Sequence, residues 1–170
     1  ALCVKDEACA QPYYQYSETR QDYYSNPDYA DFPKVAASWF EARDYCEWVG
    51  GRLPTEAEWV RAARGDDKRV YPWGDEVPDC DKANTLDENI GKLCLGDTAA
   101  VGSFPEGASP FGVMDLAGNV WEWTADWYHQ NYYSISPEIN PQGPEQGGTK
   151  VVHGGGFDYG WKLARIAYTT

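Results

Sequence analysis

Residues 38–65, which read S-W-F-E-A-R-D-Y-C-E-W-V-G-G-R-L-P-T-E-A-E-W-V-R-A-A-R-G, decide the fold of this chain. Ser38 and Glu41 stand three residues apart in the pattern of a capping box. In such a box the hydroxyl accepts a hydrogen bond from a backbone N–H, and the carboxylate accepts one from the N–H of the cap residue. Gly50 and Gly51 then supply a common helix terminator. The pattern predicts a short helix that begins after Ser38 and ends at the glycine pair.

A second capping box follows at once in the same stretch. Thr55 and Glu58 repeat the spacing behind Pro54, and Gly65 ends the segment. Apolar residues recur with helical spacing in both segments, which predicts one packing face on each helix. These faces are formed by Ala42, Tyr45, Cys46 and Val49 in the first segment and by Trp59, Ala62 and Ala63 in the second.

The rest of the chain consists of short apolar pieces separated by Gly, Pro, Asp and Asn. Residues 1–34 are rich in Tyr and Pro and show no sustained period, so we expect an irregular segment held by aromatic packing. Residues 120–127 and 151–157 carry the aromatic and β-branched side chains typical of strands. The sequence therefore predicts an α+β domain with two short helices, several short antiparallel strands and much ordered loop.

Tryptophan supplies much of the predicted core. In the strand at residues 120–127, Trp121 and Trp123 alternate with Glu122, which predicts rings on the core face and a carboxylate on the other face. The rings assigned to the core are those of Trp39, Trp48, Trp59, Trp121 and Trp123.

Length and composition exclude several classes of protein. The chain has 170 residues with 27 acidic and 14 basic side chains, which gives a formal net charge of −13. A chain without a basic cluster gains little from contacting phosphates, so nucleic acid is not expected as a partner. No stretch approaches the roughly 18 to 20 apolar residues of a membrane-spanning helix, and membrane insertion is not expected. The length suits a single domain over residues 1–170.

The five cysteines predict two disulfides and an oxidising compartment. None forms a Cys-x-x-Cys pair of the kind that holds zinc. Cys3 and Cys9 bracket a short turn and Cys80 and Cys94 bracket a polar loop, so these are the economical pairs. The remaining residue, Cys46, is then expected to be a buried thiol. Disulfides are typical of exported proteins, which predicts an extracellular or periplasmic location.

Four sequence blocks resemble the sulfatase-modifying-factor, or formylglycine-generating-enzyme, family. They are the helical stretch at 39–59, A-A-R-G with Y-P-W-G at 62–74, S-P-F-G-V-M-D-L-A-G-N-V-W-E-W-T-A-D-W at 109–127, and V-V-H-G-G-G-F at 151–157. Together these blocks cover about residues 30–168. The resemblance implies a compact, loop-rich variant of the C-type lectin fold. The strands that usually open and close family domains are not found, which implies an exposed sheet edge where another chain can pair.

The resemblance also implies a structural calcium ion. In the family, the positions that match Asp115 and Glu122 bind calcium through side chains, and those that match Gly118 and Val120 bind it through carbonyl oxygens. This mixture of ligands suits a hard cation. Asn84 matches the start of a second family calcium site, but the loop that follows departs from the family pattern, so Asn84 alone is carried over.

A plainer interpretation of the two carboxylates stays open. Asp115 would cap a turn, and Glu122 would pair with an arginine, such as Arg52, Arg61 or Arg64. The structure has to decide between this arrangement and the calcium site.

The catalytic chemistry of the family is not expected in this chain. The formylglycine-generating enzyme oxidises a substrate cysteine with a copper ion held by two cysteine thiolates, which are the ligands that select copper(I). The matching stretch, residues 154–165, contains no cysteine. His129 and His153 are the only histidines, too few for the three-histidine iron centre of related sulfoxide synthases. We therefore expect no copper and no catalytic residue.

In place of the cysteines, the same stretch carries three rings and two charges. Rigid aromatic side chains give large contact area at low entropic cost, and charges add orientation, so the mixture is typical of a recognition surface. It also resembles the variable region of diversity-generating-retroelement proteins. The alternative is that the rings close the core or an assembly contact. The candidate ligand- or partner-binding residues are Phe157, Asp158, Tyr159, Trp161 and Lys162.

The sequence thus predicts a non-catalytic, calcium-stabilised binding or assembly module. Its expected partner is a protein, a small molecule, or a larger complex that supplies an edge strand. Two other interpretations stay open. One is an oxidase of the formylglycine-generating type with displaced cysteines. The other is a structural subunit of an extracellular complex or a retroelement-diversified variable protein.

Overall fold

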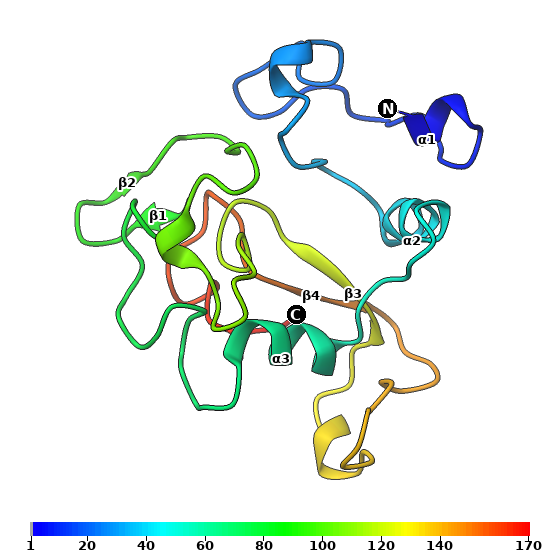
Figure 1. The fold of residues 1–170 in the computed structure, drawn as a ribbon, viewed down its shortest axis with the longest axis vertical. Helices are drawn as coiled ribbons and strands as arrows, with labels where there is room; N and C mark the ends of the chain where they lie inside the picture. The colour runs from blue at the N-terminus through cyan, green and yellow to red at the C-terminus, as the bar shows by residue number, and fades with distance from the viewer. Residues whose placement is uncertain (1) are drawn as a thin grey trace.

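The computed structural model describes residues 2–170 as an α+β chain in which loops outweigh regular elements (Figure 1). Its helices and strands are short. The helices are α1 (Leu2–Lys5), α2 (Trp39–Trp48) and α3 (Glu56–Arg64), with 3₁₀ turns at Pro27–Tyr29, Pro105–Gly107 and Tyr132–Ser134. The strands are β1 (Leu86–Asp87), β2 (Lys92–Leu93), β3 (Glu122–Trp127) and β4 (Lys150–His153). Within the described residues, no helix is long and apolar enough to cross a membrane.

Both predicted capping boxes are present. The Ser38 hydroxyl accepts from the Glu41 N–H at 3.3 Å, while Glu41 Oε2 accepts from the Ser38 N–H at 2.8 Å. Thr55 and Glu58 repeat the arrangement at 3.2 and 2.8 Å. These reciprocal bonds satisfy N–H groups that have no partner inside a helix, so local sequence alone fixes where α2 and α3 begin.

Two small antiparallel sheets organise the remainder. β3 pairs with β4, with Glu122 opposite His153 and Trp123 opposite Val152, and an irregularity interrupts the register before Trp127. β1 and β2 form a hairpin inside the segment that the Cys80–Cys94 disulfide closes. β3 covers most of the strand predicted over 120–127, whereas β4 covers only the start of the one predicted over 151–157, because the chain turns at Gly154 and Gly155, both with positive φ. The hairpin replaces what the sequence suggested was a plain polar loop.

The core lies between α3, β3 and the residues that follow β4. One buried cluster joins Trp59 and Ala63 of α3 to Leu116 and Ile166. A second cluster joins Tyr71, Ala117 and Ala164, with Val70, Trp73 and Trp161 packed against it. The buried face predicted for the second helix is therefore correct, because Trp59 and Ala63 are buried and Ala62 is partly so.

The packing face predicted for the first helix is wrong. No residue of α2 is buried, and Tyr45 and Val49 are 51% and 56% exposed. α2 lies to one side of the sheet (Figure 1) and reaches it through the Trp39 indole, which donates to the Thr124 carbonyl at 2.7 Å. Cys46 is accordingly a partly exposed free thiol rather than a buried one, and the burial it does have raises its pKa.

The predicted orientation of the β3 face is also wrong. Glu122 points toward α3, where its carboxylate accepts a hydrogen bond from the Trp59 indole. Trp121 and Trp123 are only partly buried, and Trp123 donates its indole N–H to the Ala37 carbonyl at 2.8 Å. Of the five tryptophans assigned to the core, only Trp59 is buried, because the other indoles lie at the periphery of the core.

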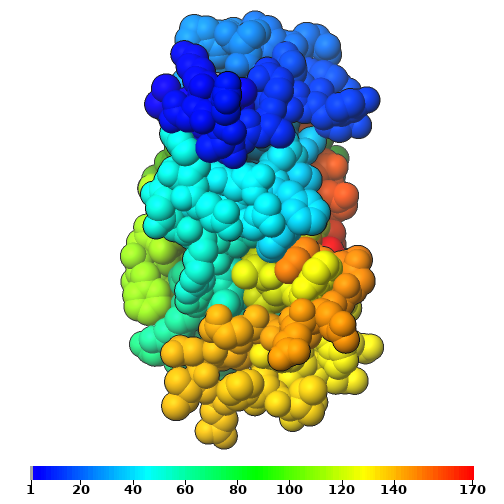
Figure 2. Space-filling model, turned by 90° about the vertical axis from the view of Figure 1, so that its right-hand side faces the viewer, coloured from blue at the N-terminus to red at the C-terminus, as the bar shows by residue number. Residues whose placement is uncertain are grey.

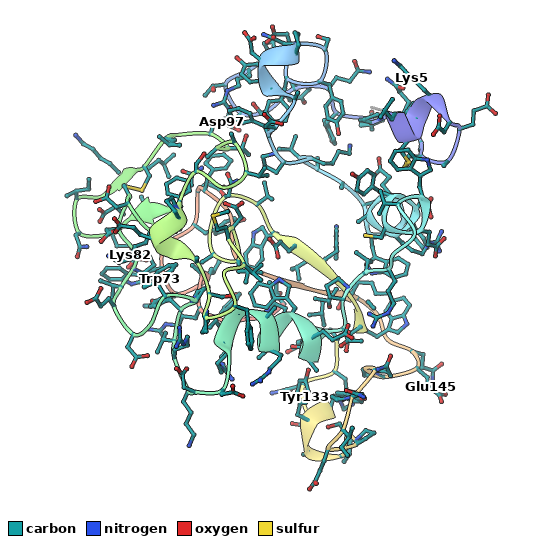
Figure 3. All side chains as sticks on the ribbon, viewed as in Figure 1. Lys5, Trp73, Lys82, Asp97, Tyr133 and Glu145 are labelled. Atoms are coloured by element: carbon teal, nitrogen blue, oxygen red, sulfur yellow. A yellow bond between two sulfur atoms is a disulfide. The ribbon has the colours of Figure 1, made fainter. Side chains whose placement is uncertain are left out.

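The N-terminal segment forms one end of the molecule, and the segment after β3 forms the other (Figure 2). Asp97 lies where the N-terminal segment meets the loops before β3 (Figure 3). Its carboxylate accepts hydrogen bonds from the Ser17 hydroxyl at 2.6 Å and from both the N–H and the hydroxyl of Thr19. Tyr23, buried behind this contact, stacks on Tyr29. The segment is irregular and held by rings, as predicted, and by one buried carboxylate.

Both predicted disulfides are present, Cys3–Cys9 and Cys80–Cys94. The edge of β4 that faces away from β3 is engaged by the last residues of the chain. The Val152 N–H donates to the Thr170 carbonyl at 3.3 Å, and the Thr169 hydroxyl donates to the Val152 carbonyl.

Candidate functional site

A tight turn over residues 115–120 positions the candidate cation site. Asp115, Gly118 and Asn119 all have positive φ, at 65°, 75° and 66°. Asp, Asn and Gly are the residue types that visit this left-handed region most readily, which explains why the sequence turns here. The turn leads directly into β3, where the Glu122 side chain faces α3.

Gly118 is held against the backbone of the preceding loop. A Cβ at this position would lie 2.4 Å from the Asn84 carbonyl oxygen, so no other residue fits. The Gly118 N–H donates to the Gly154 carbonyl, and the Asn119 N–H donates to the Asn84 carbonyl. By contrast, no donor within residues 2–170 bonds to the carbonyl oxygens of Gly118 or Val120. These two oxygens retain their capacity to accept.

The two carboxylates also keep free oxygens. Asp115 Oδ2 accepts from the Gly102 N–H at 2.7 Å, whereas Asp115 Oδ1 is buried without a partner. Glu122 Oε2 accepts from the Trp59 indole at 2.5 Å. Burial raises the pKa of Glu122 to about 7, against the Trp59 hydrogen bond and with the added repulsion of the Asp115 charge. The contribution of Asp115 to the Glu122 pKa indicates that the two carboxylates affect each other electrostatically.

The plainer interpretation of these residues is half correct. Asp115 does accept from a turn N–H, as a capping residue would. Glu122 has no arginine partner among the described residues, because Arg52 pairs with Glu58 and Arg61 with Asp66. No cluster of three or more His, Cys, Asp or Glu suited to a metal lies within residues 2–170. A cation here would therefore need carbonyl oxygens beside the two carboxylates, which is the ligand mixture that calcium takes.

Asn84 connects two loops through hydrogen bonds of its side chain. It is fully buried, and its amide donates to the Asp97 carbonyl at 2.8 Å and to Asn119 Oδ1 at 3.2 Å. The nearby Asp97 carboxylate is already saturated by protein donors, including an ion pair with Arg20 at 3.2 Å. Asn84 Oδ1 lacks a hydrogen-bond partner, and residues 2–170 contain no group of three or more metal-ligating side chains that would complete a second site there.

The candidate recognition residues divide between surface and core. Asp158 and Lys162 are exposed, and Tyr159 is 42% exposed with its ring edge against Trp121 at 5.6 Å between centroids. Phe157 is partly buried, and its N–H donates to the Asn119 carbonyl. Trp161 packs against the cluster of Tyr71, Ala117 and Ala164. The stretch thus exposes Tyr159, Asp158 and Lys162, while Trp161 packs against the core and holds the stretch in place.

His153 is the residue that sequence reasoning missed. It is 1% exposed, its ring stacks on Trp59 at 4.4 Å, and neither ring nitrogen has a hydrogen-bond partner. Its Nε2 lies 3.3 Å from Glu56 Oε1 without hydrogen-bond alignment. The signal was available, because His153 shares the buried strand face with Val151 at a spacing of two.

Known proteins resemble this chain over most of its length. It is 44% identical over 132 residues to the serine/threonine-protein kinase pkn1 of Chlamydia caviae, covering 76% of this chain and 20% of that protein. It is 40% identical over 152 residues to the formylglycine-generating enzyme of Streptomyces coelicolor, covering 81% and 45%. It is 47% identical over 107 residues to the inactive C-alpha-formylglycine-generating enzyme 2 of Bos taurus, covering 58% and 34%. The chain thus spans less than half of each relative.

Solved structures support the same fold. PvdO from Pseudomonas aeruginosa superimposes with a TM-score of 0.69 at 24% identity, covering 95% of this chain and 63% of that one. The sequence match to the family extends over residues 4–169, including the turn at Asp115 and the strand at His153. The chain belongs to the family of sulfatase-modifying factor enzyme 1-like domains.

Proposed function

We propose that this domain is a non-catalytic, calcium-stabilised binding or assembly module of its family. The observation that carries the proposal is the fate of the cysteines. Four of them form the two disulfides, and the only free thiol, Cys46, sits on α2 away from residues 154–165. No pair of thiolates is available to hold copper(I), the metal that such ligands select. A relative named as inactive at 47% identity is in keeping with this loss.

Calcium is proposed at the turn that precedes β3. Asp115 and Glu122 would bind it through carboxylates, and Gly118 and Val120 through their carbonyl oxygens. The unpartnered Asp115 Oδ1 and the unbonded carbonyls fit this role. Bound calcium would neutralise two neighbouring carboxylates and tie the turn to β3, which is a structural contribution.

The binding surface is proposed at the exposed part of residues 157–162, with Tyr159 as its aromatic centre and Asp158 and Lys162 as orienting charges. A protein or small molecule is the proposed ligand. A larger complex that supplies an edge strand is a second kind of partner, and it would displace Thr169 and Thr170 from Val152. An extracellular or periplasmic location is part of the proposal, and the two disulfides support it because such bonds persist in oxidising compartments.

Mass spectrometry tests the absence of catalysis. The domain is incubated with copper(I), oxygen and a cysteine-containing peptide, with the formylglycine-generating enzyme of Streptomyces coelicolor as the positive control. We expect the peptide to keep its cysteine mass while the control converts it. Conversion of cysteine to formylglycine by this domain would overturn the proposal and favour an oxidase with displaced cysteines.

A further inference from the structure

A cavity runs along α3, and neither the proposed calcium ligands nor residues 157–162 line it. Its volume is about 510 Å³, within the range of typical ligand sites. Its walls are mainly apolar, formed by Ala57 and Val60 of α3 and by Ile166 and Ala167. Tyr133, which lies below α3 in Figure 3, lines the end nearest Glu56. This cavity belongs to neither the cation site nor the proposed recognition surface.

Two side chains that line this cavity have buried nitrogen atoms without a hydrogen bond to any residue of 2–170, and the one near contact is the unaligned 3.3 Å approach of His153 Nε2 to Glu56 Oε1. His153 is 1% exposed, yet both of its ring nitrogens lack a hydrogen bond. Arg64 forms no ion pair with any carboxylate of residues 2–170, and its Nε is buried without an acceptor. Buried polar groups are normally satisfied, since an unpaired buried donor or acceptor loses its hydrogen bonds to water without replacing them. A ligand seated in the cavity could supply the hydrogen bonds that these nitrogen atoms lack.

The charges are separated along the cavity. Glu56 and His153 lie at the N-terminal end of α3, and Arg64 lies at its C-terminal end, about 12 Å away at 1.5 Å per residue. The neighbouring Arg61 is already committed, because it pairs with Asp66 and donates to the Gly65 carbonyl. Arg64 is thus the cation available to a ligand.

From this arrangement we infer that the cavity is a groove for an extended apolar peptide, with a basic or N–H-rich end at Glu56 and His153 and a carboxylate at Arg64. An extended chain advances about 3.3 Å per residue, so about four residues span the distance between the charges. The His153 ring offers two nitrogen atoms for hydrogen bonds with the N–H and C=O groups of a peptide backbone. The apolar walls receive the intervening side chains.

Fluorescence polarisation with three labelled, C-terminally amidated peptides tests the groove. The probes are Lys-Val-Phe-Val-Asp, its charge-reversed form Asp-Val-Phe-Val-Lys, and Lys-Val-Phe-Val-Lys. We expect the wild-type domain to bind the first peptide at least about ten-fold more tightly than the other two, which corresponds to about 1.4 kcal/mol. Arg64→Glu should reverse the preference, so that the peptide with lysine at both ends binds best.

Two further variants make the test independent of folding. Lys68→Glu makes the same change in net charge at an exposed site outside the groove and should leave the order of affinities unchanged. Ala57→Trp fills the groove and should abolish binding of every probe while the circular dichroism melt persists. The inference is overturned if no probe binds below about 1 mM, or if charge order makes no difference. Dimerisation of the domain through this groove would overturn it as well.

Discussion

The indole N–H of Trp59, on α3, donates a 2.5 Å hydrogen bond to Oε2 of Glu122, on β3. One helix thus holds one carboxylate of the candidate cation site in place, while the turn at Asp115 holds the other. The same tryptophan stacks at 4.4 Å on His153, and His153 lines the peptide groove. Trp59 is therefore the side chain that links the two sites to the core.

Glu122→Gln separates the structural role of this carboxylate from its role toward calcium. Glutamine can still accept from the Trp59 indole, so we expect stability in chelator to match or exceed that of the wild type. Calcium at 100 times its Kd should raise the free energy of unfolding of the wild type by about 2.7 kcal/mol. It should leave that of the variant almost unchanged. Urea unfolding with calcium and with chelator measures both, and an equal calcium effect in the two proteins would refute the site.

Gly118 and Gly112 form a matched pair of glycines, both with φ of 75°. Nothing lies within 4 Å of a Cβ at Gly112, whereas one at Gly118 meets the Asn84 carbonyl at 2.4 Å. Gly112→Ala should lower the free energy of unfolding by only about 1–2 kcal/mol, which is the strain of placing an alanine in the left-handed region. Gly118→Ala adds overpacking of roughly 1–3 kcal/mol and should also weaken calcium binding. Equal losses of unfolding free energy would show that the close approach at Asn84 is absent.

The contacts between Asp97 and the N-terminal segment should weaken at low pH. Burial raises its pKa, but the hydrogen bonds from Ser17 and Thr19 outweigh this, and the pKa is lowered overall. Its stabilisation is therefore complete above the unfolded pKa of about 3.9 and is lost as pH falls through the native value. Asp97→Asn should remove the pH dependence that Asp97 causes. It should also lower the free energy of unfolding by about 1–3 kcal/mol, because the new amide N–H groups would face hydrogen-bond donors.

Limited proteolysis around residues 17–34 at pH 7 and at pH 3 provides the readout for Asp97. Cleavage should rise at low pH in the wild type and be high at both values in Asp97→Asn. The exposed neighbour Glu18, changed to Gln, is the control and should behave as the wild type. A wild-type pattern in Asp97→Asn would show that the segment is held by other contacts.

The Cys80–Cys94 disulfide closes the segment that contains β1 and β2. Closing a loop of about 15 residues contributes about 3 kcal/mol in the chain-entropy model. Replacing both cysteines by serine should therefore lower the Tm by about 6–12 °C at roughly 2–4 °C per kcal/mol. Cys46→Ser, at a partly exposed position, should change the Tm by less than about 2 °C. A double variant that melts with the wild type would contradict the pairing.

Local signals in the sequence were enough for the parts of the fold that depend on neighbouring residues. The capping boxes at Ser38 and Thr55 and the strand at Lys150–His153 follow from patterns a few residues long. The predictions that were wrong concerned which face of a helix or strand packs against the core. Glu122 points inward because α3 offers an indole donor there, and Tyr45 points outward because α2 docks beside the sheet.

The sites divide in the same way. The turn at Asp115 could be predicted because its residue types and spacing carry the family pattern, and the structure adds the unpartnered oxygens. The groove could not be predicted, because Arg64, His153 and Ile166 come together only through the tertiary fold. The contacts of Asp97 could not be predicted either, because its partners Ser17 and Thr19 lie about 80 residues away in the sequence.

Native mass spectrometry of the domain, equilibrated with calcium and copper(I), tests the central claim most directly. Cys46→Ser is used as the background, so that no free thiol remains among the cysteines. The account predicts one calcium ion per chain, lost in Asp115→Asn and Glu122→Gln, and no copper. A copper adduct on the Cys46→Ser protein, or the absence of any calcium adduct that depends on Asp115 and Glu122, would contradict it.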